Sequence, residues 1–309
     1  MVDVSIIIIS YNTRDMTLAC LHSVYEQTKD IAFDVKVVDN DSKDNSAQAI
    51  AQNFPEVTLV ASKENLGFAK ANNFAAKNAK GLFLLLLNPD TIVLNGAIQK
   101  LLAFARTHPG NRVYGGRTLS ADSTLNPTSC WRKPTIWSLF CYATGFTSIL
   151  RRNALFDPES YGPWQRDSVR EVDIVTGCFL LIEKKLWDQL DGFDPQFFMY
   201  GEDADLCLRA AQEGARPIIT PDATIVHYGG ASEKVRADKM IRLFRAKEQL
   251  IQRHWPPGAG RLGKALLRFS VLSRVGACTF LKCISSRRFG TKLESWREIW
   301  QRRKEWQTS

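Results

Sequence analysis

The chain has 309 residues, of which 45% are hydrophobic and 24% are charged. This length and composition exclude a disordered chain and fit one large globular domain with an appendage, or two modest domains. The net charge of +9 is concentrated after residue 260, where 12 Lys and Arg face 3 Asp and Glu, so the first 260 residues are neutral overall.

The seven cysteines are odd in number, scattered, and without a Cys-x-x-Cys pair. They therefore do not predict a disulfide framework, a zinc site or a redox pair, and the simplest interpretation is a reducing compartment. The apolar runs at 6–9 and 82–87 are too short for a signal-peptide core or for a membrane span, which needs about 20 residues. We expect both to be buried strands of a cytoplasmic protein.

A β-branched strand at 4–10 is followed by Asn12 and Thr13, which supply capping chemistry for a helix that ends near residue 27. Strands alternating with helices and joined by short connections indicate an α/β fold with a mostly parallel central sheet flanked by helices. The pattern continues with strands expected at 35–38, 57–61 and 82–87, and helices at 42–54, 68–79 and 96–107.

The stretch 120–170 loses its periodicity and mixes Pro, Trp, Arg and Gly, which favours an irregular insertion. An apolar strand at 172–182 follows, interrupted at 176–178. We then expect helices at 184–189 and 203–213 and short strands at 217–219 and 224–226.

Polar side chains follow three of the expected strands. Because the carboxyl ends of parallel strands meet at one edge of a sheet, these side chains are expected to lie together where ligands bind. Each cluster alone is equally consistent with a helix cap or a turn, but their joint occurrence favours a site. The clusters are Ser10-Tyr11-Asn12, Asp39-Asn40-Asp41-Ser42 and Asn88-Pro89-Asp90.

Three further segments could carry chemistry, each with a structural alternative. At 65–68 and Asn72, a glycine at a helix start suits close approach of an anion, although this segment alone favours an ordinary glycine turn with helix capping. The acidic cluster 202–205 follows an apolar run, where burial raises a carboxylate pKa toward that of a general base, but acidic residues also stabilise a helix N-terminus. His227 is either structural or a metal ligand, and the carboxylate of Asp90 suits a divalent cation on a diphosphate.

These segments together, with Thr176-Gly177-Cys178, resemble glycosyltransferase family two, the inverting GT-A-type enzymes, and in particular its bacterial rhamnosyltransferase-like branch. The resemblance covers roughly the first 230 residues, and the ordered set is more specific than any one segment. It implies that the nucleotide-sugar is bound by Ser10, Tyr11, Asn12, Asp39, Asn40, Asn65, Gly67, Phe68, Asn72, Asn88 and Asp90.

The resemblance also implies the remaining roles. Asp90 and His227 would hold Mg²⁺ or Mn²⁺ on the diphosphate, and Asp203 would take the proton from the acceptor hydroxyl, with Glu202 or Asp205 as alternatives. Gly177, Cys178 and Asp205 would line the acceptor side. The broader family often has a carboxylate where this chain has Asn88, so the metal dependence is an open question.

The implied reaction transfers a sugar, with dTDP-rhamnose as the preferred donor, to a polyprenyl-diphosphate-linked saccharide for a bacterial surface polysaccharide such as lipopolysaccharide. A UDP-sugar donor and a non-catalytic nucleotide-binding membrane scaffold are the alternatives. A Rossmann dehydrogenase is disfavoured, because Ser10 to Thr13 stand where Gly-x-Gly-x-x-Gly is expected.

The C-terminal region predicts an amphipathic helix over 262–284. One side carries Leu262, Leu266, Phe269, Phe280 and Ile284, and the other carries Lys264, Arg268, Arg274 and Lys282. Trp296, Trp300 and Trp306 follow, interleaved with Arg287, Arg288, Lys292, Arg297, Arg302, Arg303 and Lys304.

This pattern is typical of a helix on the inner face of the cell membrane, although a packing helix with a solvated basic face fits nearly as well. No nucleic-acid-binding motif is present, so no nucleic-acid partner is expected. We therefore expect a catalytic domain over 1–230, with a donor half at 1–118 and an acceptor half at 119–230, and a helical, basic region over 231–309.

Overall fold

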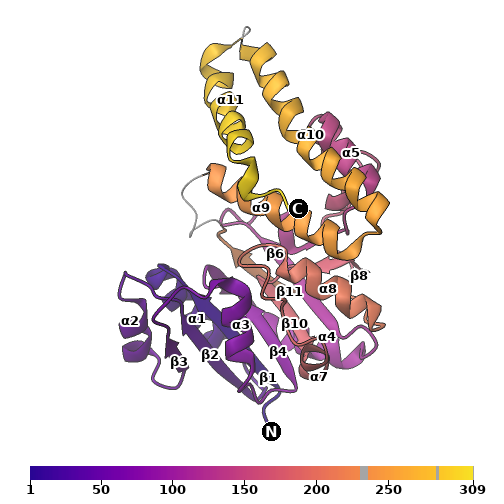
Figure 1. Ribbon diagram of the computed structural model, residues 1–309. Helices are drawn as coiled ribbons and strands as arrows, with labels where there is room; N and C mark the ends of the chain where they lie inside the picture. Colours follow the sequence, from indigo (N-terminus) through magenta and orange to yellow (C-terminus); the bar gives the residue numbers. More distant parts are fainter. Residues whose placement is uncertain (230–235, 283–284, 309) are drawn as a thin grey trace. The chain divides into compact units, whose positions relative to one another are not determined.

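The computed structural model describes residues 1–229, 236–282 and 285–308, and the chain divides into two compact units (Figure 1). Unit 1 comprises Met1–Trp131 and Trp164–Ser232, and unit 2 comprises Arg132–Pro163 and Glu233–Ser309. The boundary predicted after residue 230 falls outside the described residues. Part of the predicted irregular insertion groups with the C-terminal helices rather than with an acceptor half.

Within the described residues, unit 1 contains a nine-stranded sheet in the order β3-β2-β1-β4-β10-β6-β11-β5, with β8 also paired to β11. Six strands share one direction, whereas β5, β8 and β10 run the opposite way, so the predicted mostly parallel α/β fold is confirmed. The strands are β1 (Val4–Ser10), β2 (Phe33–Asp39), β3 (Thr58–Ala61), β4 (Phe83–Leu87), β5 (Thr91–Val93), β6 (Val113–Leu119), β8 (Arg170–Glu171), β10 (Phe179–Glu183) and β11 (Ile218–His227).

Helices cover both faces of this sheet. The strand order runs outward from β1 to β3 and then returns to β4, so right-handed crossovers place α3 on the face opposite α1 and α2. One core cluster joins alternate residues of β1, such as Ile6 and Ile8, to apolar residues of α1, α2 and α4. The helices of unit 1 are α1 (Arg14–Gln27), α2 (Ser46–Asn53), α3 (Gly67–Ala76), α4 (Ala97–Thr107), α7 (Lys184–Gln189), α8 (Glu202–Gln212) and the 3₁₀ turn η1 (Pro127–Ser129).

The structure corrects the expected strand at 172–182. Its first part, β9 (Ile174–Val175), pairs with β7 (Cys130–Trp131) in a separate two-stranded sheet, and only β10 joins the central sheet. The two short strands expected near 217–226 are one strand, β11, with an irregularity between Thr220 and Thr224.

Strand β6 was not predicted, because its centre is Gly115-Gly116 and glycine is rare in strands. Here glycine is required by packing. A Cβ at Gly115 would lie 2.5 Å from a methyl of Val175, and a Cβ at Gly116 would lie 2.2 Å from the carbonyl oxygen of Ala223.

Unit 2 is helical. Phe244 of α9, Leu267 and Val271 of α10, Ile299 of α11 and the buried Trp306 form its core. The sequence 120–170, expected to be irregular, contributes two helices, and α5 packs against α10. The elements are α5 (Ile136–Thr144), α6 (Phe146–Ile149), η2 (Pro158–Ser160), α9 (Arg236–His254), α10 (Pro257–Lys282), α11 (Ser286–Gln301) and η3 (Arg303–Glu305).

The tryptophans expected at a membrane surface lie elsewhere. Trp306 is fully buried and its indole N–H donates to the carbonyl of Ile299, while Trp296 and Trp300 pack against the same core. These tryptophans therefore pack within the helical bundle of unit 2. Ile284 and the side chains of Arg287 and Arg288 lie outside the described residues.

Helix α10 turns basic residues inward and apolar residues outward. Arg268 pairs with the buried Glu248, and the Arg274 guanidinium lies 4.0 Å from the Tyr142 ring centre. By contrast, Leu262 and Phe269 are each 50% exposed and Phe280 is 73% exposed. In the described part of the chain, no helix is both long and apolar enough to cross a bilayer.

Candidate active site

The strand ends that the sequence singled out lie at one edge of the sheet of unit 1. Strands β1, β2, β4 and β11 all finish there, and the antiparallel β10 begins there, with Phe179 paired to Leu87. The strand order reverses at β1, because the chain runs outward through β2 to β3 and then returns to β4 on the other side of β1, and open α/β sheets bind their ligands at such a point. Gly177 and Cys178 therefore join the predicted cluster through the start of β10.

Asp39 ends β2 with one carboxylate oxygen engaged and one unused. Its Oδ2 accepts the backbone N–H of Ser42 at 3.1 Å, whereas the buried Oδ1 has no partner among the described residues. A buried carboxylate oxygen without a donor is costly unless a ligand supplies one. Nearby, the Asn12 side chain accepts from the N–H of Lys43, which ties the β1 and β2 loops together.

Asn40 links β2 to the start of α3. Its side-chain nitrogen donates to Asn65 Oδ1 at 3.0 Å, and its Oδ1 accepts from the N–H of Leu66 at 2.8 Å. Gly67 has φ +74°, and a Cβ there would lie 2.5 Å from the carbonyl oxygen of Phe198. The predicted glycine requirement is thus explained by a close approach of the chain itself, because the N–H of Phe68 donates to that same carbonyl at 2.9 Å.

Asp90 and His227 meet at this edge. Asp90 Oδ1 lies 3.2 Å from His227 Nε2, and the Asn88 side-chain nitrogen lies 3.3 Å from the same ring nitrogen. Burial alone lowers the pKa of His227, but hydrogen bonds to Asp90 and Cys178 outweigh it and raise the pKa to about 10. A backbone hydrogen bond joins this pair to the start of β10, since the N–H of Asn88 donates to the carbonyl of Cys178.

The pair formed by Asp90 and His227 fits a divalent cation. Two ligands about 2.1 Å from an octahedral Mg²⁺ and on adjacent corners lie about 3 Å apart, close to the separation observed. The described residues contain no cluster of three or more His, Cys, Asp or Glu that could hold a metal. A cation here would therefore have two protein ligands, with diphosphate oxygens and water completing its shell.

Asp203 is held at the same edge from two directions. Its Oδ2 accepts the N–H of Gly177 at 3.0 Å and its Oδ1 accepts the N–H of Ala204 at 2.8 Å. Burial raises the pKa of Asp203 even though these hydrogen bonds oppose the shift, and part of the residue is still open to solvent. Gly177 also lies against Phe68, so the base candidate adjoins the nucleotide side.

Glu202 differs from its neighbour. It is only 6% exposed, and its Oε2 has no hydrogen-bond partner in the described structure. Burial, reinforced by the charge of Asp203, raises the pKa of Glu202 well above its usual value. Glu202 is therefore less accessible to an acceptor than Asp203.

Three predicted residues make internal contacts instead of lining the edge. Asp205 is fully buried and pairs with Arg209 at 2.7 Å. Asn72 is 1% exposed and donates to the carbonyl of Phe68, and the buried Ser10 hydroxyl lies 3.0 Å from that of Thr17. The structure brings the other predicted side chains to the edge, with Tyr11 partly exposed beside Asn12.

Sequence reasoning missed the residues that fix the segment before Asp203. The Asn73 side chain exchanges two hydrogen bonds with the backbone of Phe193, and Arg209 donates to the carbonyls of Leu190 and Gly192. The i,i+4 spacing of Asp205 and Arg209 was the available signal for one of these anchors. Phe198, 49% exposed and in contact with Gly67, had no such signal.

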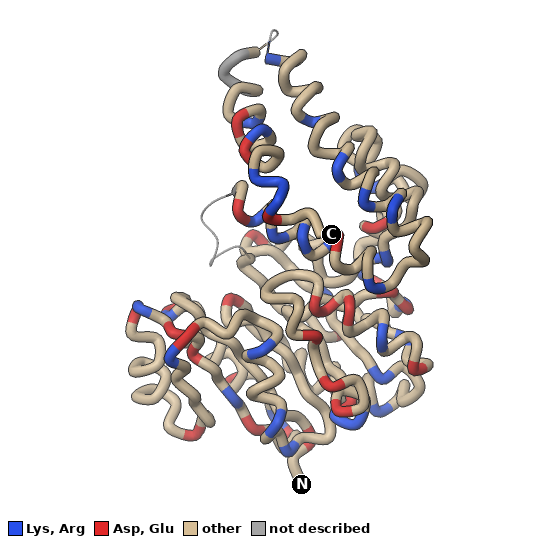
Figure 2. The backbone as a smooth tube through the Cα atoms, viewed as in Figure 1, with Lys and Arg blue, Asp and Glu red and all other residues tan. Residues whose placement is uncertain are grey.

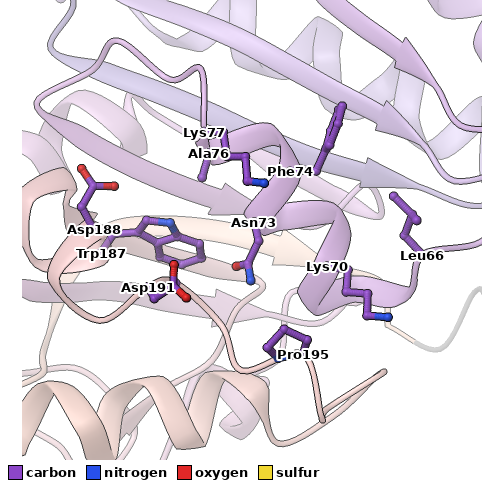
Figure 3. Close-up of a pocket in the computed structure, with 11 residues that line it drawn as sticks. Leu66, Lys70, Asn73, Phe74, Ala76, Lys77, Trp187, Asp188, Asp191 and Pro195 are labelled. Atoms are coloured by element: carbon purple, nitrogen blue, oxygen red, sulfur yellow. The ribbon is translucent and has the colours of Figure 1, made fainter.

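A cavity of about 490 Å³ lies beside α3. Figure 3 shows Lys70 and Phe74 of α3 on one side of it and Trp187 of α7 on the other. Its lining includes Leu66 of the predicted segment 65–68 but no other residue of the predicted site, so it is not the cavity of the candidate active site.

Residues 5–172, more than half of the chain, match the family described as glycosyl transferase family 2. The chain belongs to glycosyl transferase family 2. The predicted family is therefore confirmed, and the strand ends with Asp39 and Asp90 lie within the matched residues.

Relatives of this family 2 chain include rhamnosyltransferases. It is 27% identical over 213 residues to N-acetylglucosaminyl-diphospho-decaprenol L-rhamnosyltransferase of Mycobacterium tuberculosis, covering 63% of this chain and 66% of that protein. It is 26% identical over 251 residues to rhamnosyltransferase WbbL of Escherichia coli, covering 77% and 88%. With O-antigen biosynthesis protein RfbC of Myxococcus xanthus it shares 25% identity over 240 residues, which span 76% of this chain and only 18% of that protein.

Solved structures agree with the fold. A mannosyltransferase from Pyrobaculum calidifontis, in complex with GDP-Man and Mn²⁺, superposes with a TM-score of 0.58 at 18% identity, covering 96% of this chain and 84% of that one. GalNAc-T7 with UDP, GalNAc and Mn²⁺ gives a TM-score of 0.54 at 14% identity, covering 86% and 54%. At these identities the likeness concerns the fold, and it confirms the predicted GT-A-type architecture.

Proposed function

We propose that the chain is an inverting glycosyltransferase that uses a nucleotide-diphosphate sugar. The observation that carries this proposal is the chain of contacts at one sheet edge, from Asp90 and His227 through Cys178 and Gly177 to Asp203. Phe68 lies on the other side of Gly177 and extends this chain of contacts to the end of β2, where Asn40 donates to the carbonyl of Gly67 and follows Asp39. A diphosphate, an acceptor hydroxyl and a base would therefore share one location.

Each group has a defined task in this reaction. Asp203 removes the proton from the acceptor hydroxyl as that oxygen forms its bond to the anomeric carbon. The bond from the anomeric carbon to the diphosphate oxygen breaks at the same time, and the nucleoside diphosphate leaves with the bonding electrons. The free Asp39 oxygen accepts a hydrogen bond from the nucleotide. One displacement inverts the anomeric centre and needs no covalent intermediate.

Asp90 and His227 would hold Mg²⁺ or Mn²⁺, which supplies charge stabilisation to the departing diphosphate when bound. Asn88 adds no negative charge to this pair. Two solved structures of similar fold contain Mn²⁺, which supports a divalent cation for this chain as well.

For the donor we propose dTDP-rhamnose, and for the acceptor a polyprenyl-diphosphate-linked saccharide of surface polysaccharide synthesis. The names of the mycobacterial and Escherichia coli relatives support rhamnose as the sugar, and the name of the mycobacterial relative supports a polyprenyl-diphosphate-linked acceptor. A lipid-linked acceptor requires the enzyme to act at the inner surface of the membrane. The exposed apolar residues of α10, which are Leu262, Phe269 and Phe280, support such a location.

Asp203→Asn tests the enzyme assignment. We expect turnover to fall by about 10²- to 10⁴-fold, the usual loss when a general base is removed, with little change in donor affinity. Asp191→Asn, an exposed position, is the matched control.

A thermal-shift screen of nucleotide-sugars with Mn²⁺ identifies the donor, because bound ligand raises the unfolding temperature. Unchanged turnover in Asp203→Asn would contradict the role of this carboxylate, and a chain without transferase activity would be a scaffold.

A further inference from the structure

Residues 134–150 form an uncharged stretch of 17 residues, and Arg151 and Arg152 follow it directly. This stretch folds into α5 and α6 of unit 2. One side of α5, including Leu139 and Cys141, is buried, and α5 packs against α10. An uncharged segment of this length at a protein surface needs an explanation, because surfaces usually carry charges of both signs.

The other side of the segment is apolar and exposed. The Trp137 and Phe140 rings stack at 5.6 Å and the Phe146 and Phe156 rings lie 5.4 Å apart, so the rings form one cluster. Of the 17 large apolar side chains exposed in the described structure, 10 belong to unit 2, which has about a third of the residues. Six of them define what we call the aromatic face: Trp137, Phe140, Phe146, Ile149, Leu150 and Leu155, with exposed fractions between 38% and 77%.

Polar groups next to the aromatic face are satisfied within the segment. The Trp137 indole N–H donates to the carbonyl of Leu155 at 2.6 Å, and the Thr147 hydroxyl donates to that of Phe156 at 2.9 Å. The Thr144 hydroxyl donates to the carbonyl of Phe140 at 2.8 Å. These donors have partners within the segment, which lowers the cost of moving them from water into the less hydrated interfacial region.

The charge of the unit indicates what lies against this face. Unit 2 contains 23 Lys and Arg against 8 Asp and Glu, a net charge of +15, whereas unit 1 has a net charge of −6. The excess of Lys and Arg along the helices of unit 2 can be followed in Figure 2. A second copy of such a unit would be repelled, but an anionic lipid surface would be attracted.

We propose that the aromatic face inserts into the interfacial region of an anionic bilayer, with Arg151 and Arg152 at the phosphate level. Tryptophan and arginine are the side chains that suit this depth, and aliphatic residues such as Ile149 reach the acyl boundary. The inference rests on the membrane association proposed above and adds a second contact element, outside the C-terminal helices.

Co-sedimentation with vesicles tests this inference. Vesicles of phosphatidylcholine with and without phosphatidylglycerol are titrated with the full chain and with the double variant Ile149→Ser/Leu155→Ser. We expect affinity for the anionic vesicles to fall at least about tenfold, since each large aliphatic side chain withdrawn from lipid loses roughly that factor. Arg151→Gln/Arg152→Gln weakens binding to anionic vesicles only. Leu82→Ser, 52% exposed in unit 1, is the control and leaves binding unchanged.

Tryptophan quenching by brominated lipid gives a second readout, which does not depend on the double variant folding. Trp137→Phe keeps the ring cluster, so we expect binding to persist while the quenched fraction of fluorescence drops. Equal vesicle binding by the double variant, or equal quenching in Trp137→Phe, would overturn the inference. A change from dimer to monomer with unchanged vesicle binding would assign the face to a second copy. Binding of the nucleotide-sugar donor, measured without vesicles, does not depend on the aromatic face. This measurement therefore shows separately whether the transferase proposal fails.

Discussion

Glu202 and Asp203 are neighbours in sequence, yet their surroundings give them different properties. Asp203 is held by two backbone N–H groups and is partly exposed, whereas Glu202 is buried with an unpaired oxygen. A base must reach the acceptor, so Asp203 is the better candidate. The raised pKa of Glu202 makes a prediction about stability instead.

We expect Glu202→Gln to stabilise the fold at neutral pH. The folded-state pKa of Glu202 lies above its ordinary value of 4.5, so the stability that its neutral form provides is present below that pH and is lost as the pH rises through the raised pKa. Glutamine stays neutral and avoids the cost of burying or protonating a carboxylate, so the free energy of unfolding should rise by about 1 kcal/mol, a usual size for a single substitution.

The measurement is urea unfolding across a pH series, with the exposed Glu26→Gln as the control. The gain in Glu202→Gln should shrink as the pH falls through 4.5, because glutamate is neutral in both states only below that pH. A pH-independent difference, or a loss of transferase activity equal to that of Asp203→Asn, would refute this division of roles.

The sequence was sufficient to predict the residues at strand ends, such as Asp39, Asp90 and His227, because strand direction alone brings them to one edge. It could not predict which side chains turn inward. Asp205 and Asn72 lie in helices, and their burial depends on contacts with segments distant in sequence. For the same reason Asn73 was missed, since its partner Phe193 is 120 residues away.

At the scale of elements, the early part of the sheet followed from alternating patterns, and the later part did not. Helix α7 coincides with the expected helix at 184–189, while β5 is only three residues long and β6 is interrupted by two glycines. Short or glycine-rich strands are defined by their neighbours rather than by their own composition. Helix α5 was likewise hidden in a stretch without clear periodicity.

The C-terminal elements are held together by one buried carboxylate. Glu248 of α9 is fully buried, accepts hydrogen bonds from Arg268 of α10, and accepts the N–H and hydroxyl of Thr308 near the C-terminus. We predict that Glu248→Gln lowers the free energy of unfolding by about 2 kcal/mol, because it leaves the arginine without its charge partner. Thermal unfolding, with the exposed Glu294→Gln as the control, measures the effect. Equal unfolding temperatures for the two variants would show that this contact contributes little.

At the scale of the whole molecule, the chain separates two kinds of chemistry. Unit 1 contains the candidate active site and has a net charge of −6, and unit 2 has most of the exposed large apolar side chains and a net charge of +15. The predicted separation at residue 230 missed the contribution of 132–163, because residues distant in sequence joined the C-terminal bundle. The family match, over residues 5–172, covers the first part of unit 1 and the insertion, while the rest of unit 1, which contains Gly177, Asp203 and His227, lies beyond it.

The central claim is that Asp39, Asp90 and His227 bind one nucleoside diphosphate beside Asp203. Calorimetric titration of dTDP in the presence of Mn²⁺ tests it most directly. We predict that Asp39→Asn, Asp90→Asn and His227→Ala each weaken binding at least about tenfold, as expected for the loss of a charged or metal-ligating partner, whereas Asp203→Asn binds like the original chain. Unchanged dTDP affinity in both Asp39→Asn and Asp90→Asn would contradict the account.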